Sequence, residues 1–397
     1  MKLLNKIDKR YVLTLIICIF VALLCGALIM LVTGFNPIKA YQTIITGALG
    51  RPRLIGNTLE KFMTLCLLGL ATAIGAKGGL FNVGGEGQLF VGALISTMVG
   101  LQLSSLPAPL VILIAFICAI VVGGFYAWIP AMLKVKLNVS EVITTIMLNT
   151  VAIKVTTYLV NGPWCSDLVS VSKGTDYLPD SLRLTKLISA SNLSTSFIVG
   201  AVFTFLIWYF MKMTTVGLQL KLTGENARFA KFSGLKSDKI MVGSMVASGA
   251  ICGFVGMTLV YGYNGQMVDT ISTEFYFDGM LVAMIMNYNP VGIIIMSGFF
   301  AILNTGATMI DMTMGISTQI YDIIFSILIF LMAANKGFVE WFAARKMKKQ
   351  ARAIAKEKAG KENPIYVQKD KEKAYENHRS PSLCGYRKGY QSIQENY

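Results

Sequence analysis

The sequence predicts an all-α protein that crosses a membrane about ten times. Apolar residues make up 54% of its 397 residues and charged residues only 14%. The charged residues lie mostly outside long apolar runs, several of which approach the roughly 20 residues that a spanning helix needs. In chain order the predicted membrane helices are 11–33, 54–76, 87–103, 108–133, 142–160, 197–212, 240–262, 276–288, 291–310 and 319–335.

Three of these runs are short, namely 87–103, 197–212 and 276–288, and we interpret them as half-helices or strongly tilted helices. The first run is too long for a removable signal peptide and predicts a retained anchor. The seven cysteines show neither a disulfide framework nor metal-ligand spacing, so we expect no metal and no cofactor.

The net charge of +15 predicts the orientation. It is concentrated at the N-terminus (+3), in segment 212–239 (+4) and from residue 336 onward (+8). Basic residues that flank membrane helices stay in the cytoplasm. Ten crossings then place both termini and 212–239 inside and the loop 161–196 outside. We expect a membrane domain over 1–335 and a basic, partly disordered cytoplasmic tail over 336–397.

Glycine and polar residues interrupt the apolar pattern at membrane depth in two places. One interruption is Gly78–Gln88 and the other Asp269–Gly279, and each precedes a short helix. The predicted helices form two blocks of four with opposite orientation, each with one helix before it. Inverted repeats with broken helices are typical of transporters. Irregular backbone at that depth must be covered by protein or line a polar cavity.

Five polar residues are therefore candidates for the border of a translocation path: Asn82, Glu86, Gln88, Asn149 and Asp278. Two alternatives stay open. Glu86 fits a helix-capping role as well as a lining role. Asn149 belongs to a polar stripe on the fifth helix that suits interior packing and pore lining equally.

Segment 212–239 predicts a short amphipathic helix at about 225–232, with Gly224 before it and Gly234 after it. Small residues at its centre favour docking onto a partner. Its lysines would equally suit a helix lying on anionic lipid.

Several motifs, in the same order and with similar spacing, resemble one family over about residues 50–335. These are GLFNVGGEGQLFVGAL at 79–94, KLNVSEVITTIMLNTVA at 136–152, GPW at 162–164, TGENARFAKFSGLKSDKI at 223–240, SGAICGFVG at 248–256 and FDGMLVAMIMNYNPVGI at 277–293. They look like the permease subunits of bacterial ATP-binding-cassette (ABC) importers for simple sugars, branched-chain amino acids and nucleosides. The nucleoside-type members are the most similar.

The resemblance implies a bacterial inner-membrane permease for a nucleoside or simple sugar. Its partners would be a cytoplasmic ABC ATPase, a second permease subunit and an extracytoplasmic lipoprotein or periplasmic binding protein. The residues that match the family's ATPase-coupling motif are Gly224, Glu225, Asn226, Ala227, Ala230 and Gly234. The chain departs from the family pattern at Phe229, Lys231 and Met63, which bears on the identity of the partner.

The residues also exclude some classes of protein. No phosphate-binding G-x-x-x-x-G-K-[ST] loop occurs, so ATP would be hydrolysed by another chain. No nucleophile–base constellation is evident, which argues against a membrane enzyme. The basic segments flank membrane helices, so we expect no nucleic-acid partner. An ion-coupled secondary transporter remains an alternative, with Glu86, Asp278 or Asp322 as its coupling carboxylate.

Overall fold

The computed structural model describes residues 9–166, 173–188, 191–332 and 345. The chain divides into two compact units, 1–332 and 333–397, and everything below concerns the first. The predicted tail 336–397 lies outside the described residues except for Arg345, which is helical.

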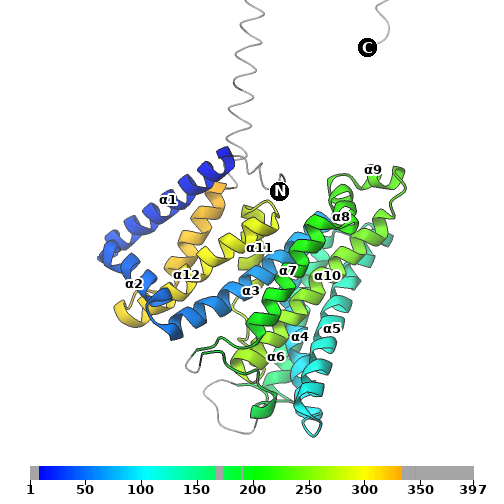
Figure 1. The fold of residues 1–397 in the computed structure, drawn as a ribbon, viewed down its shortest axis with the longest axis horizontal. Helices are drawn as coiled ribbons and strands as arrows, with labels where there is room; N and C mark the ends of the chain where they lie inside the picture. The colour runs from blue at the N-terminus through cyan, green and yellow to red at the C-terminus, as the bar shows by residue number, and fades with distance from the viewer. Residues whose placement is uncertain (1–8, 167–172, 189–190, 333–344, 346–397) are drawn as a thin grey trace, which may run out of the picture. The chain divides into compact units, whose positions relative to one another are not determined.

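Unit 1–332 is built from helices joined by mostly short connections (Figure 1). The α-helices are α1 (Lys9–Val32), α2 (Pro37–Leu49), α3 (Pro52–Lys77), α4 (Gly85–Gln102), α5 (Ala108–Leu137), α6 (Glu141–Asn161), α7 (Ser196–Met213), α8 (Thr215–Glu225), α9 (Ala227–Phe232), α10 (Ser237–Thr258), α11 (Phe275–Ile285) and α12 (Pro290–Met314). A 3-10 turn, η1 (Asp180–Leu182), lies in the long loop, a π-helix, η2 (Leu259–Asn264), continues α10, and an apolar helix, Gln319–Met332, follows α12.

Among the described residues, seven helices are long and apolar enough to cross a membrane, and two shorter apolar helices accompany them. The short ones are Phe275–Ile285 and Gln319–Met332. The 18-residue α4 is not among the seven, since its first turn carries Glu86 and Gln88. These ten helices coincide with the ten predicted segments as far as residue 332. The predicted all-α polytopic membrane fold is confirmed.

The structure adds one helix that the hydropathy pattern missed. The side chain of Asn36 caps α2 by accepting from the backbone N–H of Ile38 and Lys39, and Pro37 occupies its first turn. Both are standard helix-start signals. The face of α2 that carries Ile44 packs on α12, so closely that a Cβ atom on Gly306 would lie 2.5 Å from the Ile44 side chain. Residues 37–49 are therefore a packed helix and not a loop.

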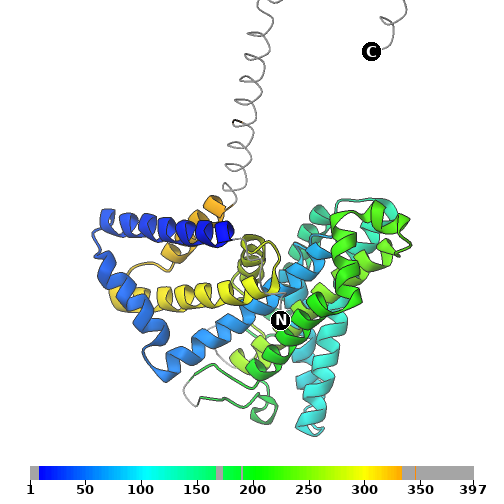
Figure 2. The ribbon, with the colours of Figure 1, turned by 45° about the horizontal axis from the view of Figure 1, so that its top comes forward.

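The helices of each block pack against those of the other. The first block is α3–α6, and the second is α10, α11, α12 and the helix Gln319–Met332. In the first block, α3 packs against α11 and α12 of the second block. In the second block, α10 packs against α4 and α5 of the first (Figures 1 and 2). This packing is reciprocal, as expected for two repeats that meet at a common interface. The two short helices α4 and α11 are thereby held by the long helix of the opposite block.

Close packing at α10 depends on glycine. A Cβ atom on Gly92 of α4 would lie 2.5 Å from the Cα of Gly253, and one on Gly123 of α5 would lie 2.9 Å from the same atom. Small residues let helices approach in lipid, where association depends on packing contacts rather than on excluding water.

Candidate functional site: the polar break and the α8–α9 projection

The polar break between α3 and α4 is held by side chains rather than by helix. Asn82 is fully buried, and its Nδ2 donates to Oε1 of Gln88 at 2.8 Å and to Oγ of Ser248 at 3.0 Å. Its Oδ1 accepts from the backbone N–H of Gly84 at 3.0 Å. A single amide thus satisfies groups from the break, α4 and α10. Buried polar groups at this depth require such partners.

Glu86 joins the two short helices at their N-termini. Its Oε2 accepts from the backbone N–H of Tyr276 at 2.9 Å, in the first turn of α11. The Tyr276 hydroxyl donates to the backbone carbonyl of Asn82, so the contact is reciprocal. A Cβ atom on Gly85 would overlap the Tyr276 ring, which explains the glycine at that position. Glu86 therefore satisfies a backbone N–H in the first turn of α11, whereas α4, the helix it was expected to cap, has no side-chain cap.

Helix α6 holds the same break from the other side. The side-chain oxygen of Asn149 accepts from the backbone N–H of Gly87, and Oγ1 of Thr145 accepts from Val83 N at 3.4 Å. Four of the five predicted path residues thus form one network of contacts that reaches α6, α10 and α11. None of the four is more than 7% exposed in the isolated chain.

Asp278 lies apart from this network, in a second polar cluster. Its Oδ2 accepts from the Tyr321 hydroxyl at 3.1 Å, and Asn304 lies beside that hydroxyl. Lys61 of α3 donates to the side-chain oxygen of Asn304. We call Lys61, Asp278, Asn304 and Tyr321 the lysine cluster. Lys61, Asn304 and Tyr321 were not among the residues predicted for the site, although a lysine ten residues into a spanning helix is itself a functional signal.

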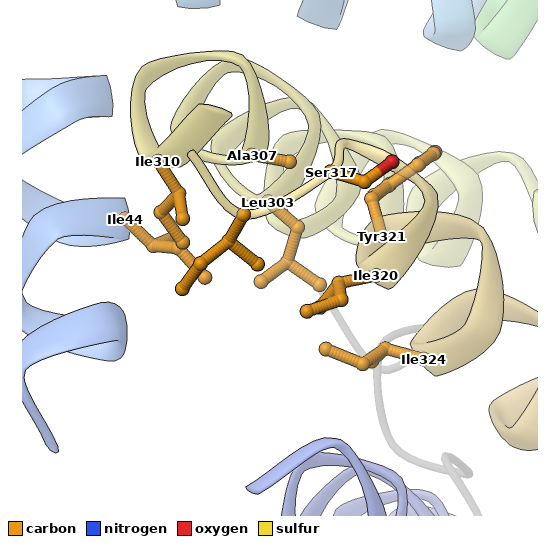
Figure 3. A pocket seen from close by; sticks show the side chains of 9 residues that line it. Ile44, Leu303, Ala307, Ile310, Ser317, Ile320, Tyr321 and Ile324 are labelled. Carbon is orange, nitrogen blue, oxygen red and sulfur yellow. The ribbon is translucent and has the colours of Figure 1, made fainter. Parts of the chain in front are cut away.

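A small cavity adjoins Tyr321, and its lining is apolar. Ile44 of α2, Leu303 of α12 and Ile324 point toward it (Figure 3). Its volume is about 10 Å³, about that of one water-sized probe. It is a packing defect rather than a solute site. Asp322, the third candidate carboxylate, is exposed on the surface of the Gln319–Met332 helix.

Segment 212–239 folds as two helices, α8 and α9, which project at one end of α7 and α10 (Figures 1 and 2). Asn226 caps α9 by accepting from Phe229 N at 3.0 Å, and Gly234 follows α9 with a φ of +83°, where glycine is favoured. The predicted helix at about 225–232 therefore exists, beginning at Ala227, and Glu225 ends α8 instead.

Gly224 and Ala230, two residues of the predicted coupling motif, both lie against other parts of the chain. Gly224 lies within α8, and a Cβ atom there would overlap the carbonyl oxygen of Lys77 at the end of α3. Ala230 is 0% exposed and is covered by its own chain. The most exposed apolar side chain of α9 is Phe232, at 91%. Phe229 on the same helix is 58% exposed, so α9 presents two exposed aromatic rings.

Residues 54–333 match a protein family described as branched-chain amino acid transport system / permease component. The chain is 31% identical to the nucleoside ABC transporter permease protein NupB of Lactococcus lactis subsp. cremoris, over 89% of this chain and 97% of that one. It is 30% identical to the guanosine ABC transporter permease protein NupP of Bacillus subtilis, over 84% and 96% of the two chains. The glucose ABC transporter permease protein TsgB13 of Haloferax volcanii is 26% identical over 82% of this chain and 88% of its own length.

No solved structure matches the chain. The resemblance inferred from the motifs is confirmed by these relatives and by the family match, which covers most of the membrane unit. With its polytopic helical fold and its two interrupted helices, the chain belongs to the branched-chain amino acid transport system / permease component family of ABC transporter permeases.

Proposed function

We propose that this chain forms half of the membrane path of an ABC importer for nucleosides. The carrying observation is its likeness to nucleoside and guanosine permeases over more than four-fifths of its length. The second permease subunit, the cytoplasmic ABC ATPase and the extracytoplasmic binding protein are the partners that such a permease needs.

The ATPase would dock on α8–α9, with Gly224, Glu225, Asn226, Ala227, Ala230 and Gly234 building the element and Phe232 entering the partner. Contacts within the chain support this role. Gly224 lies against the Lys77 carbonyl and within 3.5 Å of the position that a Cβ atom on Gly79 would take. Gly78 packs against Ser244 of α10. A displacement of α8 would thus act directly on the residues that open the polar break.

The solute path would pass the polar break and the lysine cluster. Asn82, Glu86, Gln88 and Asn149 would fix the two short helices in place, and Asp278 with Lys61 would offer charged and hydrogen-bonding groups to a polar solute. The side chains of Lys61 and Asp278 are only partly buried in the isolated chain, which leaves them open to a solute or to the second permease. Nucleosides carry hydroxyl and amide groups that such side chains can bind.

We propose that both termini and 212–239 lie in the cytoplasm and 161–196 outside, because basic residues that flank membrane helices stay in the cytoplasm. Cysteine labelling in intact cells tests it. Position 173 should react with an impermeant thiol reagent, and position 228 should react only after the membrane is opened. The reverse pattern would contradict the proposed orientation.

Reconstitution tests the function. The permease pair and its ATPase, placed in vesicles with the binding protein, should take up labelled guanosine only when ATP is present on the ATPase side. Glucose uptake of equal rate would contradict the proposed solute. Guanosine uptake driven by an ion gradient without the ATPase would contradict ATP coupling.

A further inference from the structure

A cleft of about 560 Å³ lies between α7, α8 and α10, beside the α8–α9 projection. Its floor is Ile74 of α3, its walls include Phe210 and Ile240, and Val216 and Leu220 of α8 form its roof. The volume is in the range of specific ligand sites, typically about 300–1,000 Å³.

Large side chains join α7 and α10 at one point, and small residues line α10 at another. The Phe203 ring of α7 stacks on Phe254 of α10 with centroids 4.9 Å apart. Toward α8 the wall of α10 is formed by Gly243, Ser244 and Ala247. A Cβ atom on Gly243 would meet no atom within 4 Å, so the small residue leaves open space.

Two lysines, Lys236 and Lys239, line the same cleft. Both are exposed, and neither pairs with a carboxylate of the described residues. The neighbouring Asp238 is oriented toward Lys231, at 3.9 Å. The site therefore combines an apolar interior with positive charge at the end of two membrane helices.

Helix α7, which lines the cleft through Phe210, is largely uncovered in the isolated chain. Helix α7 is the least buried of the seven candidate spans, with 17% of its apolar window buried, and its Phe205 is 60% exposed. In the membrane these exposed apolar side chains face acyl chains. A ligand that reaches the cleft from the bilayer would carry an acyl chain into the apolar part and a charged head group to the lysines.

We propose that the cleft binds one anionic phospholipid, with its phosphate at Lys236 and Lys239 and an acyl chain between Phe210 and Ile240. The negative head group complements the unpaired lysines. The lipid site does not depend on which solute is carried, but it adjoins the element on which the ATPase would dock, since Gly234 and α8 line the cleft. Because Val216 and Leu220 roof the cleft, the bound lipid would brace α8 against the membrane helices.

Native mass spectrometry of the purified full-length chain, titrated with phosphatidylglycerol and with phosphatidylcholine of the same acyl chains, tests the proposal. We expect one tightly held phosphatidylglycerol. The double variant Lys236→Gln/Lys239→Gln should weaken the affinity for phosphatidylglycerol by about thirtyfold. Each lysine near an anionic head group contributes about five- to sixfold in affinity, and two are removed. Phosphatidylcholine binding should stay unchanged.

A matched control removes the same charge elsewhere on the segment. Lys221→Gln/Lys231→Gln should leave phosphatidylglycerol binding within about twofold of wild type, since these lysines do not line the cleft. Gly243→Leu should fill the open space and displace the lipid while keeping the melting temperature. If that variant fails to fold, the comparison of phosphatidylglycerol affinity between the two lysine double variants tests the proposal by itself.

Three results would overturn the proposal. The two double variants could lose lipid equally, which would show general surface attraction. Phosphatidylcholine could bind as tightly as phosphatidylglycerol. Free glycerol 3-phosphate could displace the lipid at low concentration, which would assign the lysines to a soluble anion instead.

Discussion

The polar break and the α8–α9 projection use polar and apolar residues in opposite ways. At the break, polar side chains are buried: Asn82 is 0% exposed and Glu86 is 3% exposed, and each has hydrogen-bond partners from other segments. On α9, an aromatic side chain is exposed, with Phe232 at 91%. The polar side chains of the break are buried and hydrogen-bonded within the chain, whereas α9 presents an exposed aromatic side chain to the solvent.

This difference separates two kinds of function. Removing a group from the break should leave buried polar atoms unsatisfied and weaken the fold. Removing a group from the exposed face of α9 should leave the fold intact and weaken association with a partner. Variants in the two regions should therefore differ in which measurement they change.

The largest effect is expected at Gly85. Gly85→Val would drive side-chain atoms into the Tyr276 ring at the meeting point of α4 and α11. Overpacking of this kind costs about 3 kcal/mol or more, which corresponds to a fall in melting temperature of about 6–12 °C. Thermal unfolding in detergent measures it. Gly243→Val is the matched control, because the position is open, and it should change the melting temperature little.

A smaller loss is expected from Glu86→Ala. The variant leaves the Tyr276 N–H buried without its acceptor and should cost about 1–3 kcal/mol. Glu86→Gln keeps a carbonyl oxygen in place and should recover more than half of that loss in the same unfolding measurement. If both variants unfold as wild type but stop uptake, Glu86 acts on the solute rather than on the fold.

The sequence predicts the polar break itself, but not that the five candidate residues divide between a buried network and the lysine cluster. Composition and run length suffice for the ten apolar helices, since both are local properties. Asp278 could not be separated from Glu86 in this way. Tyr276 and Asp278 are two residues apart on α11, about 200° around the helix, so the first faces Glu86 and the second faces Tyr321.

The helix α2 and the buried side of α9 could not be predicted from the hydropathy pattern, and each has a physical reason. The polar residues of α2 resemble a loop, and only Asn36 followed by Pro37 signals its start. Helical periodicity predicted the short helix at about 225–232, but it does not say which side of a six-residue helix the chain itself covers. Ala230 is covered because Leu235 folds back and donates its backbone N–H to the Ala230 carbonyl at 3.0 Å.

On α9 we expect Phe232→Ala to weaken binding of the ATPase by about tenfold, as truncation of an aromatic anchor does. The melting temperature of the permease should not change, because the ring contacts little of its own chain. Pull-down of the ATPase measures the loss of binding, and thermal unfolding of the permease shows whether the fold is unchanged. Ala230→Trp is the contrasting variant: it should lower both, since it overpacks a buried position.

The smallest effect is expected at Lys231. Its ammonium lies 3.9 Å from the Asp238 carboxylate, and the two side chains are 73% and 60% exposed. An exposed pair of this kind contributes little to stability because water and salt screen it. Lys231→Ala should therefore leave the melting temperature unchanged and alter ATPase binding by about twofold at most. A tenfold loss that disappears at high salt would instead show that the ATPase meets α9 through an acidic surface, so that charge and not Phe232 dominates docking.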